Sequence, residues 1–249
     1  MTAPLTIAIL GATGDLGSHL LCAISEHPKA QDVRLRILTR PTSTETAHNL
    51  LARYPTLYVT VHAIDYSATE LGLDAALHGV DVVLSAVRDD SDLTRQDVKH
   101  SGLLPGFLAQ DAVARAAKAA GVRLFVPSEY GSPTHLMSLD SDSYVVGKRF
   151  HHELLRELQL PYLLVYSGSF PEVEPAATPL PPQSAEAPIA LGEPPFETTR
   201  AHLAVYVIEL ILDRGLDSVA GEIHVLRGLR RDRAIVSAET GKTEWVLDG

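Results

Sequence analysis

Short apolar runs alternate with helix-like stretches through the first two thirds of the chain. The runs are rich in branched and other apolar residues, as is typical of buried strands, and they cover residues 5–10, 34–38, 57–62, 81–85, 122–126 and 162–166. Segments typical of helices lie between them, at 18–26, 44–53, 70–78, 107–120 and 145–159. This alternation predicts an α/β fold, a doubly wound parallel sheet with helices on both faces. The loops that follow the strands should then meet at one crevice.

The pattern changes after residue 166. Eight of the sixteen prolines fall within 171–195, and a long Pro-rich connection in a compact protein is usually functional or mobile. We interpret it as a flap or part of a substrate lobe; a solvated loop without a role is the alternative. A helix capped by Thr198 and ending near 213 should follow, then a strand at 222–226. The tail from 230 to 249 shows no clear period, and no element is assigned to it. The expected domains are nucleotide-binding at 1–166 and a small, interleaved C-terminal lobe at 167–249.

Three glycines stand between the first strand and the first helix. Gly11 allows a sharp turn, Gly14 allows a pyrophosphate to approach the backbone, and Gly17 allows the helix to pack closely on the strand. The N–H groups of the first helical turn have no partner within the helix and favour an anion. This context predicts a dinucleotide-binding turn, although a glycine-rich turn that binds nothing is the alternative. The expected cofactor contacts are Gly11, Thr13, Gly14, Asp15, Leu16 and Gly17.

The end of the second strand indicates which dinucleotide would bind. NAD-binding sites usually place a carboxylate here against the ribose 2′-hydroxyl, whereas a 2′-phosphate requires a cation. Residues 38–41 hold no carboxylate, and Arg40 supplies a guanidinium that suits a phosphate. We therefore predict NADP(H), with a solvated surface role for Arg40 as the alternative.

Charge and composition exclude several classes of partner. The 249 residues include 21 Lys and Arg and 31 Asp and Glu, a net charge of −10. A nucleic-acid backbone is therefore not an expected ligand, because such binding requires clustered cations. No targeting signal or membrane-spanning stretch is visible, so we expect a soluble, cytoplasmic protein. The eleven histidines show no metal-binding spacing, and we predict no metal.

Candidate acid–base chemistry lies between the fifth and sixth strands. Tyr144 and Lys148 are four residues apart, which places them on one face of a helix. The lysine cation favours the phenolate of such a tyrosine and so lowers its pKa, which suits proton transfer to a carbonyl oxygen. Ser128 follows the fifth strand and could hydrogen-bond to the same oxygen. The alternatives are a surface aromatic for Tyr144 and an ordinary turn residue for Ser128.

Four segments resemble the NmrA-like and isoflavone-reductase-like group of atypical short-chain dehydrogenases. The segments are residues 11–17, the strand-five sequence 125–131, Lys148 with the later run 160–165, and 197–199 before an apolar helix. The resemblance implies a Rossmann fold that binds NADP(H), a catalytic Lys148, and often reduction of a small aromatic or polyketide-like molecule. Ser85, Ala86 and Ser167, at the ends of strands, and Lys148, which can also hold the nicotinamide ribose, complete the expected cofactor contacts. The resemblance does not identify a substrate. It also leaves open whether the protein forms a homodimer.

These observations favour an NADPH-dependent reductase of a small organic carbonyl or conjugated alkene. The cofactor would carry the hydride, and Tyr144 or Lys148 would supply the proton. Two other functions stay open. An NADP(H)-sensing regulator would bind the cofactor without turnover. A redox-neutral isomerase, dehydratase or cyclase would use Lys148, Tyr144 or a histidine as acid or base, with the cofactor idle or absent.

Overall fold

The computed structural model describes residues 3–65, 72–87, 105–137, 143–170, 198–227, 230–236 and 243–247. The Pro-rich segment 171–195 lies outside these residues. The strands are β1 (Leu5–Leu10), β2 (Val33–Thr39), β3 (Tyr58–Ala63), β4 (Val82–Ser85), β5 (Leu124–Val126), β6 (Leu164–Tyr166), β7 (Glu222–Arg227), β8 (Arg230–Val236) and β9 (Thr243–Leu247). The helices are α1 (Asp15–Glu26), α2 (Thr44–Leu51), α3 (Leu73–Leu77), α5 (Pro105–Ala120), α6 (Ser143–Glu157), α7 (Arg200–Glu209) and α8 (Leu216–Val219).

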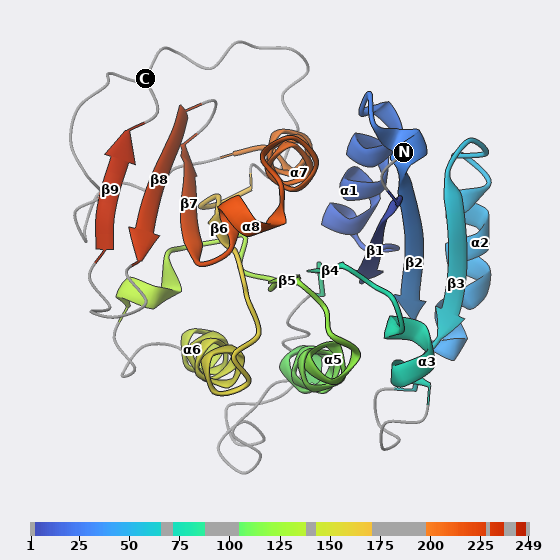
Figure 1. Cartoon of the computed structure of the whole chain (residues 1–249), viewed down its shortest axis with the longest axis horizontal. Helices are drawn as coiled ribbons and strands as arrows, with labels where there is room; N and C mark the ends of the chain where they lie inside the picture. The colour runs from blue at the N-terminus through green and yellow to red at the C-terminus, as the bar shows by residue number, and fades with distance from the viewer. Residues whose placement is uncertain are drawn as a thin grey trace.

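The first five strands form one parallel sheet in the order β3-β2-β1-β4-β5. Ile7 of β1 lies opposite Leu35 of β2 on one side and Val82 of β4 on the other. The strand order therefore reverses between β1 and β4, and ligands bind at the carboxyl ends of strands beside such a reversal. The predicted α/β architecture, a Rossmann-like doubly wound sheet, is confirmed (Figure 1).

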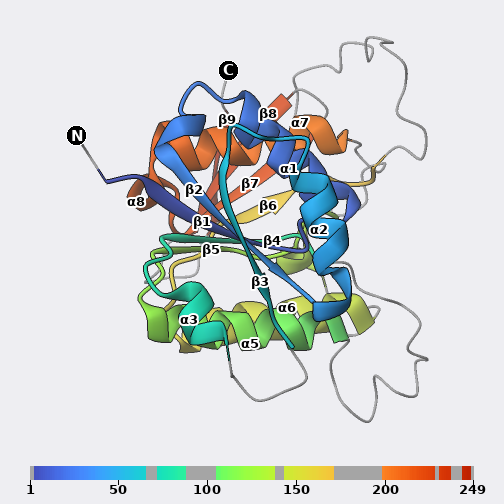
Figure 2. The same ribbon diagram turned by 90° about the vertical axis from the view of Figure 1, so that its right-hand side faces the viewer.

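Helices cover both faces of this sheet (Figure 2). On one face, α1 and α7 bury Leu20, Ile24 and Val207 in the core that contains Ile7 and Ile9 of β1. On the other, α3, α5 and α6 pack against the opposite side chains of the same strands. Because both faces are covered, the central strands β1 and β4 are buried along almost their whole length, whereas β2 and the edge strand β3 keep exposed positions. Among the described residues, no helix has the length and hydropathy that crossing a membrane requires.

A second sheet follows in the order β6-β7-β8-β9. The β6 and β7 strands are parallel, whereas β7, β8 and β9 are antiparallel. A parallel bridge between Phe125 and Tyr162 joins β5 to the segment that leads into β6. The tail to which the sequence assigned no element thus contains two strands, β8 and β9.

Helix α7 belongs to the C-terminal part of the chain but packs beside α1 (Figure 1). Its N-cap is Thr199, which accepts a hydrogen bond from the backbone N–H of His202 at 3.2 Å. The expected cap, Thr198, instead donates its hydroxyl to the backbone oxygen of Leu226 at 3.4 Å. The sequence prediction was therefore wrong by one residue, because Thr198 is buried against β7.

Candidate active site

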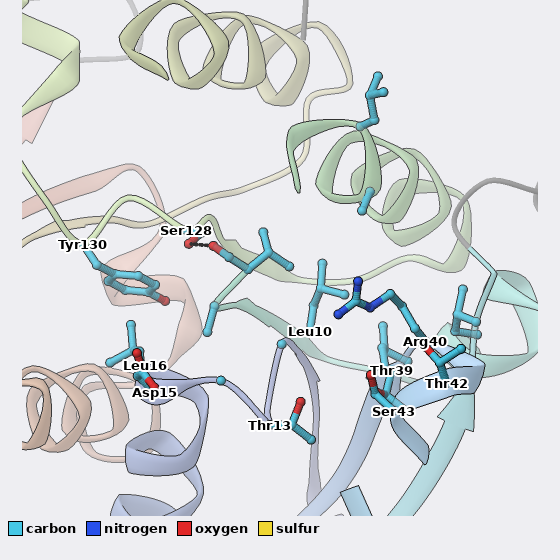
Figure 3. Close-up of a pocket in the computed structure, with 18 of the residues that line it drawn as sticks. Leu10, Thr13, Asp15, Leu16, Thr39, Arg40, Thr42, Ser43, Ser128 and Tyr130 are labelled. Carbon is cyan, nitrogen blue, oxygen red and sulfur yellow. Dashed lines mark hydrogen bonds between the residues drawn. The ribbon is translucent and has the colours of Figure 1, made fainter. Parts of the chain in front are cut away.

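A cavity of about 1020 Å³ opens at the carboxyl ends of β1, β2, β4 and β5 (Figure 3). This volume lies at the upper end of the range usual for small-molecule sites. The loops that follow these strands meet here, as the strand pattern predicted. The lining residues are Leu10, Gly11, Thr13, Gly14, Asp15, Leu16, Leu38, Thr39, Arg40, Pro41, Thr42, Ser43, Ile64, Asp65, Ala86, Val87, Leu108, Ala109, Ser128, Glu129, Tyr130, Lys148, Phe170 and Arg200.

The glycine turn is packed so tightly that side chains would not fit at two of its positions. Gly11 has a φ of +84°, and a Cβ on it would lie 2.7 Å from the backbone oxygen of Ala86. A Cβ on Gly17 would lie 2.2 Å from the backbone oxygen of Gly11. Gly14 caps α1 without a side-chain hydrogen bond and lines the cavity. The start of α1 is thus a cradle whose backbone and helix dipole suit a phosphate.

Arg40 stands at the cavity rim, immediately after β2. Its side chain is exposed, and Figure 3 shows the guanidinium extending over the cavity from the same side as Thr39 and Ser43. A guanidinium beside hydroxyl groups is a fitting environment for a phosphate monoester. Arg40 and the turn at Gly14 border the same cavity.

The three predicted catalytic residues differ in what the structure shows of them. Lys148 of α6 lines the cavity, is 8% exposed, and donates from Nζ to the backbone oxygen of Glu129 at 2.7 Å. Ser128 also lines the cavity, and its hydroxyl donates to the backbone oxygen of Val87 at 2.7 Å. Tyr144 falls in the first turn of α6, but its side chain lies outside the described part of the structure.

A buried carboxylate behind Lys148 carries interactions that the sequence did not predict. Oxygen Oε1 of Glu129 pairs with Nε2 of His152 at 2.9 Å, and Oε2 accepts from the Thr134 hydroxyl at 2.7 Å. Nζ of Lys148 lies 4.0 Å from Oε2. Burial alone raises the pKa of Glu129, but Lys148 and the hydrogen bonds outweigh burial and hold that pKa below its ordinary value. An ionised Glu129 thus anchors the lysine at the cavity wall.

The remaining predicted cofactor residues lie at strand ends, at different depths. Ala86 lines the cavity, whereas Ser85 and Ser167 are fully buried and do not line it. Ser167 donates its hydroxyl to the backbone oxygen of Tyr130 at 2.8 Å, so it acts on the loop after β5. Tyr130 belongs to the strand-five motif, from which the sequence predicts no role for it, although it lines the cavity.

Phe170 and Arg200, which precede and follow the Pro-rich segment in the sequence, both border the cavity. The Arg200 guanidinium lies 4.6 Å from the centroid of the Phe170 ring, a cation–π arrangement. Within the described ranges, no three His, Cys, Asp or Glu side chains are grouped so that they could hold a metal ion.

A parallel sheet with a glycine turn and a cavity at its reversal point defines a Rossmann-type fold. The chain belongs to the NmrA-like family, whose family model matches residues 4–176. The resemblance seen in the sequence is thereby confirmed.

Comparisons with individual proteins support the same class. The oxidoreductase aprR of Aspergillus flavus is 29% identical over 128 residues, which make up 51% of this chain and 34% of that protein. The chain therefore spans about a third of the length of this curated relative. The structure of AtPrR2 with NADP+ and (+)pinoresinol superposes with a TM-score of 0.64 at 19% identity, covering 92% of this chain and 72% of that one. A crystal structure of isoflavone reductase gives 0.63 at 23% identity, covering 90% and 70%. These structural likenesses show the fold.

Proposed function

We propose that the protein is an NADPH-dependent reductase of a small organic carbonyl or conjugated alkene. The observation that carries this proposal is one cavity whose wall includes Arg40, the glycine turn at Gly14, and Lys148. In this proposal, a cation suited to a phosphate, a turn suited to a dinucleotide and a side chain able to give a proton border the same cavity. Relatives named as an oxidoreductase and as reductases support the proposal.

The lining residues fit the parts of NADP(H) by their chemistry. Arg40 would hold the 2′-phosphate, and the backbone at Gly14 and the start of α1 would hold the pyrophosphate. A Cβ on Gly14 would come within 3.3 Å of the backbone oxygen of Gly11, at the edge of tolerated contact. Lys148, which lines the same cavity, would contact the nicotinamide ribose. When bound, the cofactor supplies a hydride to the substrate.

Lys148 is the described side chain best placed to provide the matching proton. Its ammonium group donates one hydrogen bond to the backbone oxygen of Glu129. Two N–H donors therefore remain. The Glu129 carboxylate at 4.0 Å fixes the position of the ammonium group and compensates its charge. The proton would pass to the substrate directly, through water, or through Tyr144.

The test combines nucleotide titration with turnover. We expect calorimetric binding of NADPH, and loss of nicotinamide absorbance when a panel of quinones and enones is added. Lys148→Met, which keeps the length but removes the charge, should lower kcat about 100-fold, within the usual range for a lost acid catalyst. Lys118→Met is the matched control, because Lys118 lies on the exposed side of α5 and bonds only to the backbone of Gln159 in the described structure. Absence of NADPH binding would contradict the proposal.

Arg40 provides a separate prediction about cofactor choice. Arg40→Ala should weaken NADPH binding about 10- to 100-fold, the value of a charge-assisted hydrogen bond to phosphate, and leave NADH affinity nearly unchanged. Calorimetry with both nucleotides measures the difference. Arg53→Ala is the control, because Arg53 is an exposed residue in the turn after α2 and is not among the cavity-lining residues. Equal losses for NADPH and NADH would contradict a 2′-phosphate contact.

One observation favours a second function, nucleotide sensing without turnover. The Ser128 hydroxyl donates its only proton to the backbone oxygen of Val87 at 2.7 Å, and the Lys148 ammonium group is held by the backbone oxygen of Glu129 at 2.7 Å. A regulator needs such groups only to shape the cavity. Tight NADPH binding without absorbance loss across the whole panel would support the sensor over the reductase.

A further inference from the structure

The Tyr130 hydroxyl is a buried polar group at the wall of the cavity. The residue is 5% exposed, and among the described residues its hydroxyl has no hydrogen-bond partner. Figure 3 shows the ring lying over Leu16 and Asp15 at the start of α1, with its hydroxyl directed along the cavity. Buried hydroxyls nearly always have a partner, and each exception calls for an explanation.

The backbone of Tyr130 is held in an unusual conformation that fixes the ring there. Its φ of +30° lies in the left-handed region that non-glycine residues rarely occupy. Two contacts maintain it: the Tyr130 N–H donates to the backbone oxygen of Val165 at 3.0 Å, and Ser167 donates to the Tyr130 carbonyl at 2.8 Å. Strain that the surroundings hold in place is common at ligand sites.

The protonation state of this phenol limits what it can do. Burial, reinforced by the adjacent Glu129 carboxylate, raises the pKa of Tyr130 above its ordinary value. The group therefore stays a neutral phenol near neutral pH. A neutral phenol in this position offers one O–H donor to whatever occupies the cavity.

We propose that the Tyr130 hydroxyl donates a hydrogen bond to an oxygen of the nicotinamide half of the bound nucleotide. This rests on the proposed function, namely on NADP(H) as the ligand. In the proposed binding mode Arg40 holds the adenosine 2′-phosphate, and Tyr130 lies on the opposite side of the cavity from Arg40, over the start of α1 (Figure 3). The nicotinamide half has ribose and carboxamide oxygens that can accept, so Tyr130 is a positioning residue for the ring that carries the hydride.

Tyr130→Phe tests this directly, because it removes only the hydroxyl. We expect the dissociation constant for NADP+ to rise about five- to tenfold, as for loss of one hydrogen bond. The affinity for 2′,5′-ADP, which lacks the nicotinamide half, should stay unchanged. The melting temperature of the nucleotide-free protein should stay equal or rise, because an unpaired buried hydroxyl is removed. Calorimetry and thermal melting supply both readouts, and neither depends on turnover.

The controls separate this inference from the proposed function. Tyr58→Phe, on an exposed strand outside the cavity lining, should change neither affinity. Arg40→Ala should weaken both NADP+ and 2′,5′-ADP. Unchanged NADP+ affinity in Tyr130→Phe, or an equal loss for both ligands, would overturn the Tyr130 contact alone. Failure of the wild-type protein to bind either nucleotide would overturn both proposals. Tyr130→Met, which also lacks the hydroxyl, repeats the measurement if the Phe variant gives no folded protein.

Discussion

At the scale of single residues, the buried polar cluster behind Lys148 contains a histidine that is held neutral. The ring of His135 stacks on Tyr166 with centroids 5.0 Å apart, and among the described residues neither ring nitrogen has a hydrogen-bond partner. Burial, together with the charges of His152 and Arg149, lowers the pKa of His135 to about 4, although Glu129 acts in the opposite direction. Protonation of His135 therefore opposes folding.

The sign of the resulting pH dependence follows from this lowered pKa. An unfolded histidine titrates near 6.5, so the stability is fully present above that pH and is lost as the pH falls toward 4. Between pH 7.5 and 5 the loss should be about 2 kcal/mol. His135→Phe keeps the ring stacking and should remove most of this loss, as urea unfolding at both pH values would measure. His78→Phe, at an exposed site, is the matched control. An unchanged loss in His135→Phe would show that other groups cause it.

Sequence reasoning identified the residues whose chemistry depends on local context. Arg40 and the glycines were found because they follow strands, and the structure places them at the cavity; their roles stay predictions. Glu129 and Tyr130 were seen only as parts of a motif. Their burial comes from Thr134, His152 and β6, which pack against the loop after β5. A single sequence does not show such contacts between distant residues.

At the scale of elements, the junction of β1 and α1 depends on two glycines in different ways. Gly17→Ala would place a Cβ 2.2 Å from the backbone oxygen of Gly11, so α1 would have to move away from β1. We expect a loss of about 3 kcal/mol in the free energy of unfolding, typical of overpacking. Gly14 has a φ of −80°, which alanine can also adopt, and a Cβ on it would lie 3.3 Å from the backbone oxygen of Gly11. For Gly14→Ala the loss in the free energy of unfolding should therefore stay below about 1 kcal/mol.

Nucleotide affinity should separate the same two variants. Gly14→Ala should fold and yet bind NADP+ more weakly, because its methyl group lies where a pyrophosphate would approach. Urea unfolding and NADP+ calorimetry on both proteins make the comparison. If Gly17→Ala were as stable as Gly14→Ala, the close approach of α1 to β1 would not be a requirement of the fold.

Element boundaries followed the local signals only where those signals were strong. The sequence expectation began the first helix at Ser18, whereas α1 begins at Asp15, directly after the glycine that caps it. The cap of α7 was displaced by one residue because Thr198 and Thr199 are equivalent in sequence. Their difference is tertiary: Thr198 packs against β7, which leaves Thr199 to cap the helix.

At the scale of the whole molecule, the parallel order and the crevice were predictable, whereas the C-terminal strands were not. Alternating apolar runs and helices permit few arrangements other than a doubly wound sheet. The strands β8 and β9 lack such a signal, since β8 begins with Arg230, Arg231, Asp232 and Arg233. Their strand structure depends on pairing, of β8 with β7 and of β9 with β8. The sequence alone does not show that β7 offers an edge for this pairing.

Removal of residues 228–249 tests what β8 and β9 contribute. Strand β7 would become an edge, and its N–H and C=O groups would be open to pairing with another chain. The sheet that carries the cluster of Leu164, Tyr166, Ile223 and Val225 would be reduced from four strands to two. We expect the melting temperature to fall by about 5 °C or more, with concentration-dependent association in size-exclusion chromatography.

Nucleotide binding provides the contrast in that experiment. Every lining residue within the described part of the structure lies at or before Arg200, so the shortened chain should bind NADP+ with nearly unchanged affinity at temperatures below its melting transition. Calorimetry on the monomeric fraction measures this. A large loss of affinity, despite an intact far-UV circular dichroism spectrum, would mean that the antiparallel strands help to shape the cavity through β6 and the loop that holds Tyr130. Retained affinity would mean that β8 and β9 stabilise the second sheet and do not shape the cavity.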